Sequence, residues 1–267
     1  MLRARFTGTS GFGVTIDRNP PGLLVDGRLL FDAGEGVTRR LVEWGANCSQ
    51  VEHVFLSHQH ADHFFGFVTL FWQMVVVERR RTPLVVHGLP QVLADVKSLV
   101  KSPEVPLSLQ NFELRFDALE LSERPAPIPL DVGDELRVFH VSTRHAVPSL
   151  AFRVEHESGA KLAYGGDGAP NEGLRVLAER CDVLVHEATF PDEMFELAGA
   201  TGHSTPSQAA RFARQARVDC LILTHLPPAE VTNQESFLAG AQKEFPRVEL
   251  AHDGMEFTIS GPGAKLP

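Results

Sequence analysis

The sequence predicts an α+β fold, a mixed α/β architecture in which two stacked β-sheets carry helices on their outer faces. Short apolar segments typical of strands occur along the whole 267-residue chain. Helical patterns follow the strands in each half, without the strict alternation of a parallel doubly wound sheet. Since no segment has the composition of a linker, we expect a single domain over residues 1–267.

In the first half, a hairpin is the most clearly defined element, because Asp26-Gly27 supplies the positive φ angles of a tight two-residue turn. The helix after residue 63 is apolar on all sides, so it should be buried in the core or against another subunit. We interpret Arg79-Arg80-Arg81 at its end as a solvated helix terminus rather than a nucleic-acid patch. The predicted elements are strands over 22–25, 28–31, 51–56 and 84–86, and helices over 35–44, 64–77 and 90–100.

In the second half, the helix over 206–216 has the clearest start. Thr205 is its cap, Pro206 lies in the first turn and Gln208 completes a capping box. Three prolines between residues 123 and 129 indicate an extended loop. The other predicted elements are strands over 112–116, 136–141, 150–156, 161–164, 182–187 and 220–224, a helix over 172–180, and a final pair of strands over 248–251 and 256–259.

The composition limits the partners and the compartment. A formal net charge of −9 argues against a broad surface for polyanions, because nucleic-acid affinity rests largely on Lys and Arg. Three cysteines without close spacing favour neither disulfides nor a Cys-rich zinc site. The N-terminal residues lack a signal-peptide core, and the apolar run over 64–77 is too short for a membrane span. We therefore expect a cytoplasmic protein without a membrane partner.

A cluster of metal-ligand types lies in Ser57-His58-Gln59-His60-Ala61-Asp62-His63, between the predicted strand over 51–56 and the apolar helix. Imidazole is a preferred ligand of zinc, and a carboxylate adds neutralising charge. A short loop can direct His58 and His60 at one ion and Asp62 and His63 at a second. The alternative, a polar loop with unrelated histidines, explains this density of ligand types less well.

The run His58-x-His60-x-Asp62-His63 resembles the metal-binding signature of the metallo-β-lactamase superfamily, and its surroundings resemble the ribonuclease Z branch. The resemblance covers nearly the whole chain. It implies the αββα metallo-β-lactamase sandwich and two bound Zn²⁺ per chain, with Mn²⁺ or iron as the other candidate metals. The supporting motifs are Phe6-Thr7-Gly8-Thr9, Arg18-Asn19-Pro20, Leu30 to Gly36, His145 with Val147 to Leu150, Gly166-Asp167, His186 to Phe190, Gly202 to Thr205, and Thr224-His225.

The resemblance also implies which residues hold the metals. It assigns His58, His60 and His145 to one zinc, Asp62, His63 and His225 to the second, and Asp167 with a hydroxide to a bridge between the two ions. From the residues alone, Asp167 is equally explained as a turn residue, since Gly and Asp favour turns. His225 is likewise explained as a strand-end histidine with a satisfied hydrogen bond.

Two further residues are implied to take part in catalysis. In the family, residues at the positions of Glu187 and His203 pair near the metals. His203 would steady the transition-state oxyanion or protonate the leaving group, and Glu187 would orient its ring. The alternative for His203 is structural support of a helix start. Asp62 is a candidate general base, and Asp32 is a candidate hydrogen-bond acceptor that orients a ligand histidine.

These residues suit a zinc phosphodiesterase that directs a metal-bridging hydroxide at phosphorus. Only 21 residues lie between His145 and Asp167, too few for the tRNA-gripping arm of many ribonuclease Z proteins. The segment 226–230 also lacks the Ser and the Arg-Tyr that the family usually carries. We therefore favour a small or cyclic phosphodiester substrate over RNA. The alternatives are tRNA 3′ processing by a ribonuclease Z and a lactonase or thioesterase activity, and the resemblance also suggests a homodimer.

Overall fold

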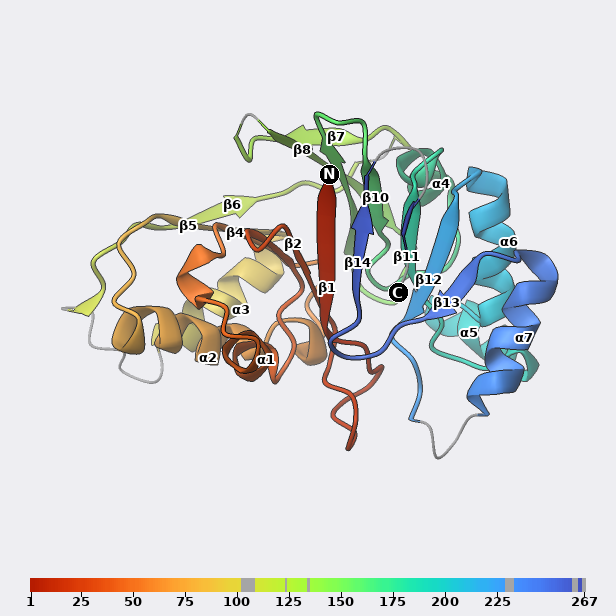
Figure 1. Ribbon diagram of the computed structural model, residues 1–267, viewed down its shortest axis with the longest axis horizontal. Coiled ribbons are helices and arrows are strands. Elements are labelled where there is room, and N and C mark those ends of the chain that lie inside the picture. Colours follow the sequence, from red (N-terminus) through yellow and green to blue (C-terminus); the bar gives the residue numbers. More distant parts are fainter. Residues whose placement is uncertain (102–108, 123, 134, 229–232, 261–263, 266–267) are drawn as a thin grey trace.

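Two β-sheets face each other in the computed structural model, and helices cover the outer face of each sheet (Figure 1). The structure describes residues 1–101, 109–122, 124–133, 135–228, 233–260 and 264–265. Three residues of the segments discussed above, Glu123, Ala229 and Glu230, lie outside these ranges. The layered arrangement confirms the predicted αββα sandwich of two mixed sheets.

The first sheet contains the N-terminal strands. In spatial order, its strands over the described residues are β15 (Ala264–Lys265), β14 (Glu256–Ile259), β1 (Leu2–Gly8), β2 (Gly22–Val25), β3 (Leu29–Phe31), β4 (His53–Phe55), β5 (Leu84–Gly88) and β6 (Leu114–Ala118). Strands β14 to β3 pair antiparallel, and strands β3 to β6 run parallel. Asp26 and Gly27 have φ angles of 49° and 69°, which confirms the predicted tight turn between β2 and β3.

The second sheet has the mirrored pattern. In spatial order, its strands over the described residues are β13 (Val248–Leu250), β12 (Cys220–Thr224), β11 (Val183–Glu187), β10 (Lys161–Tyr164), β9 (Ser149–His156), β8 (Leu136–Thr143) and β7 (Ile128–Leu130). Strands β13 to β10 run parallel, and strands β10 to β7 pair antiparallel. Strand β9 is antiparallel to both of its neighbours, β8 and β10. Strands β8, β10, β11 and β12 therefore all run in the same direction. Their carboxyl ends therefore share one edge of the sheet.

The helices lie on the two outer faces (Figure 1). The first sheet is covered by α1 (Val37–Glu43), α2 (Gly66–Trp72) and α3 (Pro90–Lys101), and the second by α4 (Glu172–Ala178), α6 (Pro206–Ala216) and α7 (Gln234–Glu244). A shorter helix, α5 (Phe195–Thr201), precedes α6, which starts with the predicted capping box. None of the helices in the described ranges combines the length and apolar composition needed to cross a membrane.

Aromatic rings join the two sheets. Phe152 of β9 lies 5.6 Å from Phe31 of β3 and 5.4 Å from Phe55 of β4, measured between ring centroids. All three rings are buried. A second apolar cluster, which includes Leu174, Ala210 and Leu221, lies between the second sheet and its helices. The apolar strands predicted from the sequence therefore form the inner layers. Their packing fixes the position of the strand ends of one sheet relative to those of the other.

The two predicted final strands are present as β13 and β14. They lie in different sheets, because the segment between them crosses from β12, where Ala251 N bonds Leu223 O, to β1, where Phe6 N bonds Met255 O. Two predictions about elements need correction. Helices α5 and α7 lie in segments for which no helix was predicted. The proline-rich loop contains strand β7, and Pro129 is tolerated there because β7 is an edge strand.

The apolar helix is buried on one side only. Residues 66–72 form α2, and residues 73–77 continue as a π-helical turn. Phe67 and Phe71 pack in the core, whereas Phe65, Trp72 and Val77 are 52%, 40% and 60% exposed. The core therefore buries only one side of the helix, and the predicted alternative, burial of the outer side against another subunit, stays a prediction.

The arginine run after this helix also differs from the prediction. Arg79 and Arg81 are exposed, but Arg80 is buried and only 2% exposed. Its guanidinium donates hydrogen bonds to four backbone carbonyl oxygens, those of Ser49, Val51, Thr82 and Pro83, at 2.6–2.9 Å. Arg80 is thus a buried structural residue that cross-links backbone segments, rather than part of a solvated terminus or a nucleic-acid patch.

Candidate metal centre

All seven predicted metal ligands converge at one edge of the sandwich. His58 to His63 follow β4, and the other three follow β8, β10 and β12, whose carboxyl ends lie together. Potential ligand atoms within each of two groups lie within 4.8 Å of one another. The groups are His58, His60, His145 and Asp167, and Asp62, His63 and His225. The structure therefore brings together residues that are far apart in the chain.

The histidines of the first group surround a common point. His60 Nδ1 lies 2.9 Å from His58 Nε2 and 3.2 Å from His145 Nε2. Asp167 Oδ2 lies 4.0 Å from His58 Nε2. Nitrogens this close, with a carboxylate behind them, are spaced as the ligands of one cation are.

The second group is built around Asp167 as well. Asp167 Oδ2 lies 3.4 Å from His63 Nε2 and 3.2 Å from His225 Nε2, and Asp62 Oδ2 lies 3.5 Å from His225 Nε2. Both of these Nε2 atoms are buried without a hydrogen-bond partner. Buried polar atoms are rarely left unpaired. The two unpaired imidazole nitrogens, which face carboxylates, therefore fit a divalent cation.

The opposite ring nitrogen of most of these histidines is fixed by the protein. A hydrogen bond at Nδ1 decides which nitrogen faces a metal. The Nδ1 partners are Ser57 Oγ for His58 (2.9 Å), Asp32 Oδ2 for His63 (2.8 Å), Gly202 O for His145 (3.0 Å) and Thr189 Oγ1 for His225 (2.8 Å). Each of these four rings consequently presents Nε2 to the cluster.

The carboxylates supply negative charge that suits a divalent cation. Burial alone would raise the pKa of Asp62, but the adjacent imidazoles of His225 and His63 lower that pKa to about 2. The group is therefore ionised at neutral pH, as a ligand must be. A carboxylate with such a low pKa is a weak base, so the geometry favours Asp62 as a ligand over Asp62 as a general base.

Glu187 and His203 form the predicted pair at the same edge. Glu187 Oε1 accepts a hydrogen bond from His203 Nδ1 at 3.0 Å, and Oε2 accepts from the Thr189 hydroxyl at 2.7 Å. Burial lowers the pKa of His203, but the hydrogen bond and the charge of Glu187 outweigh that effect and raise it above its ordinary value. His203 therefore holds a proton more strongly than an isolated imidazole does.

Two contributing side chains were not predicted. Thr189 Oγ1 contacts both Glu187 and His225, so one hydroxyl links the Glu187–His203 pair to a predicted metal ligand. Tyr164 donates its hydroxyl proton to Asp32 Oδ2 at 2.7 Å. Thr189 lies in the recognised motif from His186 to Phe190, but Tyr164 is a strand residue whose position gives no local signal.

The histidines to which no chemistry was assigned lie elsewhere. His186 forms a hydrogen bond with a backbone oxygen, and its ring packs near Phe212 of α6, on the outer face of the second sheet. His53 Nδ1 contacts His87 Nε2 at 2.9 Å, and His87 Nδ1 contacts Asp117 Oδ2 at 2.8 Å. His53 is the first residue of β4, and His87 pairs with Phe55 at the last, so this contact lies along the first sheet and outside the metal-ligand groups.

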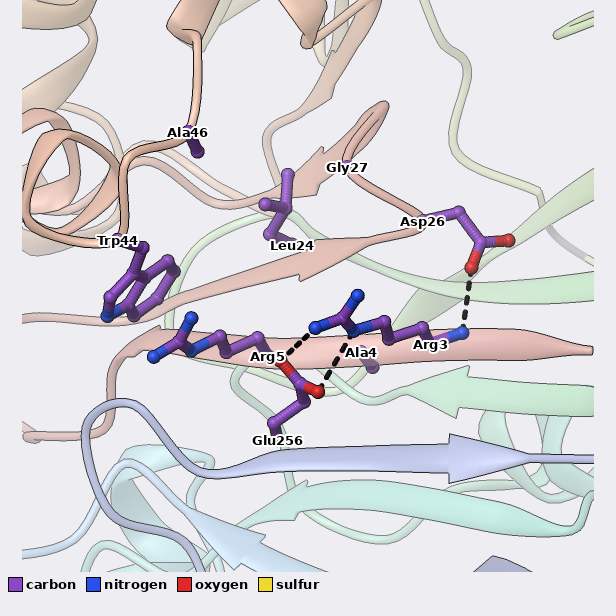
Figure 2. A pocket seen from close by; sticks show the side chains of 9 residues that line it. All are labelled: Arg3, Ala4, Arg5, Leu24, Asp26, Gly27, Trp44, Ala46 and Glu256. Atoms are coloured by element: carbon purple, nitrogen blue, oxygen red, sulfur yellow. Dashed lines mark hydrogen bonds and ion pairs between the residues drawn. The ribbon is translucent and has the colours of Figure 1, made fainter.

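Figure 2 shows a separate cavity of about 350 Å³ beside β1, formed without any residue of the metal centre. Two arginines of β1 line it. Arg3 pairs with Glu256 at 2.9 Å, and the Arg5 guanidinium lies 3.8 Å from the centroid of the Trp44 ring. Because the chain's own groups already engage both arginines, this cavity adds nothing to the chemistry of the centre.

Comparison with known proteins agrees with this geometry. Residues 27–226 match the family model of the beta-lactamase superfamily domain. The chain is 31% identical to a ribonuclease Z of Haloarcula marismortui and 33% identical to one of Myxococcus xanthus, each over 98% of both chains. The fold matches human tRNase Z, short form, with a TM-score of 0.82, 24% identity and coverage of 96% and 99%. It also matches the metallo-beta-lactamase fold protein YhfI from Bacillus subtilis, with a TM-score of 0.79, 21% identity and coverage of 96% and 98%. The chain therefore belongs to the metallo-β-lactamase superfamily, in its ribonuclease Z-like branch, and is a metal-dependent hydrolase.

Proposed function

We propose that this hydrolase cleaves phosphodiester bonds with two divalent metal ions, Zn²⁺ in the first place and Mn²⁺ or iron as alternatives. The observation that carries the proposal is the hydrogen bond between His203 and Glu187 beside two groups of metal-ligand side chains. An alkoxide leaving group needs a proton, and the His203–Glu187 pair can supply that proton beside the proposed metal ions, which would bind the phosphate.

The chain's own residues divide the work. His58, His60 and His145 hold one ion, Asp62, His63 and His225 hold the other, and Asp167 is shared between the two groups. Metal binding supplies charge neutralisation at the phosphate and water activated at neutral pH. Glu187 keeps the proton of His203 on Nδ1, and the raised pKa of the ring provides a second proton on Nε2 for the departing oxygen.

The substrate that we favour is a small or cyclic phosphodiester. The alignment with the Haloarcula ribonuclease Z spans 308 positions against a chain of 267 residues, so that relative contains segments that this chain lacks. The connection between His145 and Asp167 is one short segment, with room for a hairpin but not for an arm that grips tRNA. In addition, the net charge of −9 gives no broad attraction for RNA.

The second candidate substrate is precursor tRNA. Its support is the similarity to proteins named ribonuclease Z over 98% of both chains. On this alternative, the same catalytic residues act on an RNA strand, and contacts outside the described centre hold the tRNA.

A substrate panel separates these candidates. The purified protein, loaded with Zn²⁺ or Mn²⁺, is assayed with bis(p-nitrophenyl) phosphate, 3′,5′- and 2′,3′-cyclic nucleotides, precursor tRNA and an acyl lactone. We expect turnover of phosphodiesters and a large loss in His203→Ala. Hydrolysis of the lactone alone would overturn the proposal in favour of an acyl hydrolase, and efficient cleavage of precursor tRNA would select the second candidate.

We also propose a homodimer and a single domain over residues 1–267, in the cytoplasm. Phe65 and Trp72 lie seven residues apart, so they are close to one face of α2, and both are exposed in the single chain. Light scattering of the wild type and of Trp72→Glu tests the dimer. One cooperative unfolding transition tests the single domain, and cell fractionation tests the compartment.

A further inference from the structure

Phe12 stands at the rim of the metal centre in an unusual conformation. It belongs to the segment Gly11-Phe12-Gly13 between β1 and β2, and its φ angle is 69°. Its side chain is 62% exposed. The ring centroid lies 6.2 Å from that of His203, 6.1 Å from that of His225 and 5.8 Å from that of Phe190. An exposed aromatic ring thus adjoins a metal ligand and the proton-carrying histidine.

The backbone around Phe12 is held in place. Leu226 N donates to Thr9 O at 2.9 Å, and Gly11 N donates to Leu226 O at 2.8 Å, so the segment pairs with the residue after His225. A Cβ at position 11 would lie 2.7 Å from His225 Nδ1, which only glycine avoids. The ring is therefore exposed, whereas the backbone that carries it is held in place beside His225.

Both features of Phe12 are unfavourable for the protein alone. A bulky residue in the left-handed region is strained, and an exposed ring leaves apolar surface in water. Strained residues cluster at sites that bind ligands, because the ligand contact is what the conformation serves. The rings of Phe12 and Phe190 meet in a T-shaped arrangement with an interplanar angle of 65°, and Phe12 remains 62% exposed.

We infer that Phe12 is a stacking platform for the nucleobase next to the scissile phosphate. This inference rests on the proposed phosphodiesterase function and names the residue that binds the base. A sugar separates phosphate from base in a nucleotide, and Phe12 stands beside the cluster rather than within it. Every base offers a π-face, so such a contact selects a nucleotide without selecting its sequence.

Two esters with the same leaving group test the contact. Thymidine 5′-(p-nitrophenyl phosphate) and methyl p-nitrophenyl phosphate differ only in the nucleoside. We expect Phe12→Ala and Phe12→Leu to lower the preference for the nucleoside ester, measured as the ratio of kcat/KM values, about tenfold and mainly through KM. Phe12→Trp should keep the preference. Ile16→Ala is the matched control, since Ile16 is a fully exposed apolar residue of the same connection.

A binding measurement keeps the test independent of turnover. Calorimetry with thymidine 5′-monophosphate and with methyl phosphate should show that Phe12→Ala weakens the first about tenfold more than the second. An unchanged preference in Phe12→Ala, or retention of it in Phe12→Leu, would overturn the stacking role. If the wild type hydrolyses neither ester, the proposed function fails, and the calorimetric comparison still decides whether Phe12 binds the base.

Discussion

Asp32 Oδ2 accepts a hydrogen bond from His63 Nδ1 at 2.8 Å, with both side chains buried. The same carboxylate accepts from the Ser57 backbone N–H, the Ser57 hydroxyl and the Tyr164 hydroxyl at 2.7–2.9 Å. This contact fixes the tautomer of His63 and turns Nε2 toward the metal groups. On the proposed metal binding, Asp32 would act through His63, the ligand that it orients.

Loss of this carboxylate should weaken metal binding. We expect Asp32→Asn to lower the affinity for the ion held by His63 about 10- to 100-fold, because a neutral amide orients and polarises the imidazole less well. Competition with a chromophoric chelator measures this affinity. Tyr164→Phe removes one donor but keeps the carboxylate, so its effect should be clearly smaller. An Asp32→Asn protein with wild-type affinity would refute the role.

His203 should matter more when the leaving group is poor. If its Nε2 proton goes to the departing oxygen, His203→Ala should lower kcat by about 10²- to 10⁴-fold for an alkoxide leaving group. The loss should be smaller for p-nitrophenolate, which leaves without a proton. Glu187→Gln should show the same trend, since the carboxylate holds the charged ring. Equal losses for both leaving groups, with metal content unchanged, would point to transition-state charge stabilisation instead.

Arg80 should be a stability residue. Arg80→Ala leaves four backbone carbonyls without their charged donor, and it should lower the free energy of unfolding by at least about 2 kcal/mol. Arg81→Ala, an exposed neighbour, should change it by less than about 0.5 kcal/mol. Urea unfolding of both variants provides the comparison. A nucleic-acid role would instead show as weakened RNA binding with unchanged stability.

His140 should make stability depend on pH. Burial lowers the pKa of this β8 histidine to about 4, and its Nδ1 has no hydrogen-bond partner. The unfolded chain, with a pKa near 6.5, binds more protons between these values. The stability that the neutral His140 contributes is therefore fully present above about pH 6.5 and is lost as the pH falls toward 4.

The matched variant isolates this effect. Between pH 7 and pH 4.5, metal-free wild type should lose about 2–3 kcal/mol more unfolding free energy than His140→Leu, because only the wild type must protonate this site. Urea unfolding at the two pH values measures the difference. Parallel losses in both proteins would show that His140 is not the titrating group.

The sequence predicted the loop from His58 to His63 directly, because four potential metal ligands lie within six residues after a strand. His145, Asp167 and His225 carry no such local signal, and only the family resemblance linked them to the loop. The positions of β8, β10 and β12 explain the link, since their parallel direction places the three side chains at one edge. A contact between distant strand ends cannot be found from periodicity.

Other features depend on tertiary contacts. Helices α5 and α7 contain Gly199 and Gly240, which lower helix propensity and hide the pattern. At Gly240, a Cβ would lie 2.6 Å from Asp192 Oδ2, so a larger residue would displace the Asp192 side chain. The proposed role of Phe12 likewise depends on a tertiary contact, the pairing of its segment with Leu226.

The central claim is that two ligand groups hold two ions. Metal analysis of the purified protein, reconstituted with Zn²⁺ and then dialysed, tests it most directly. We predict two ions per wild-type chain, one in His145→Ala and one in His225→Ala, because each variant removes a ligand from a different group. A wild-type chain that retains no metal, or variants that retain as much as the wild type, would contradict the account.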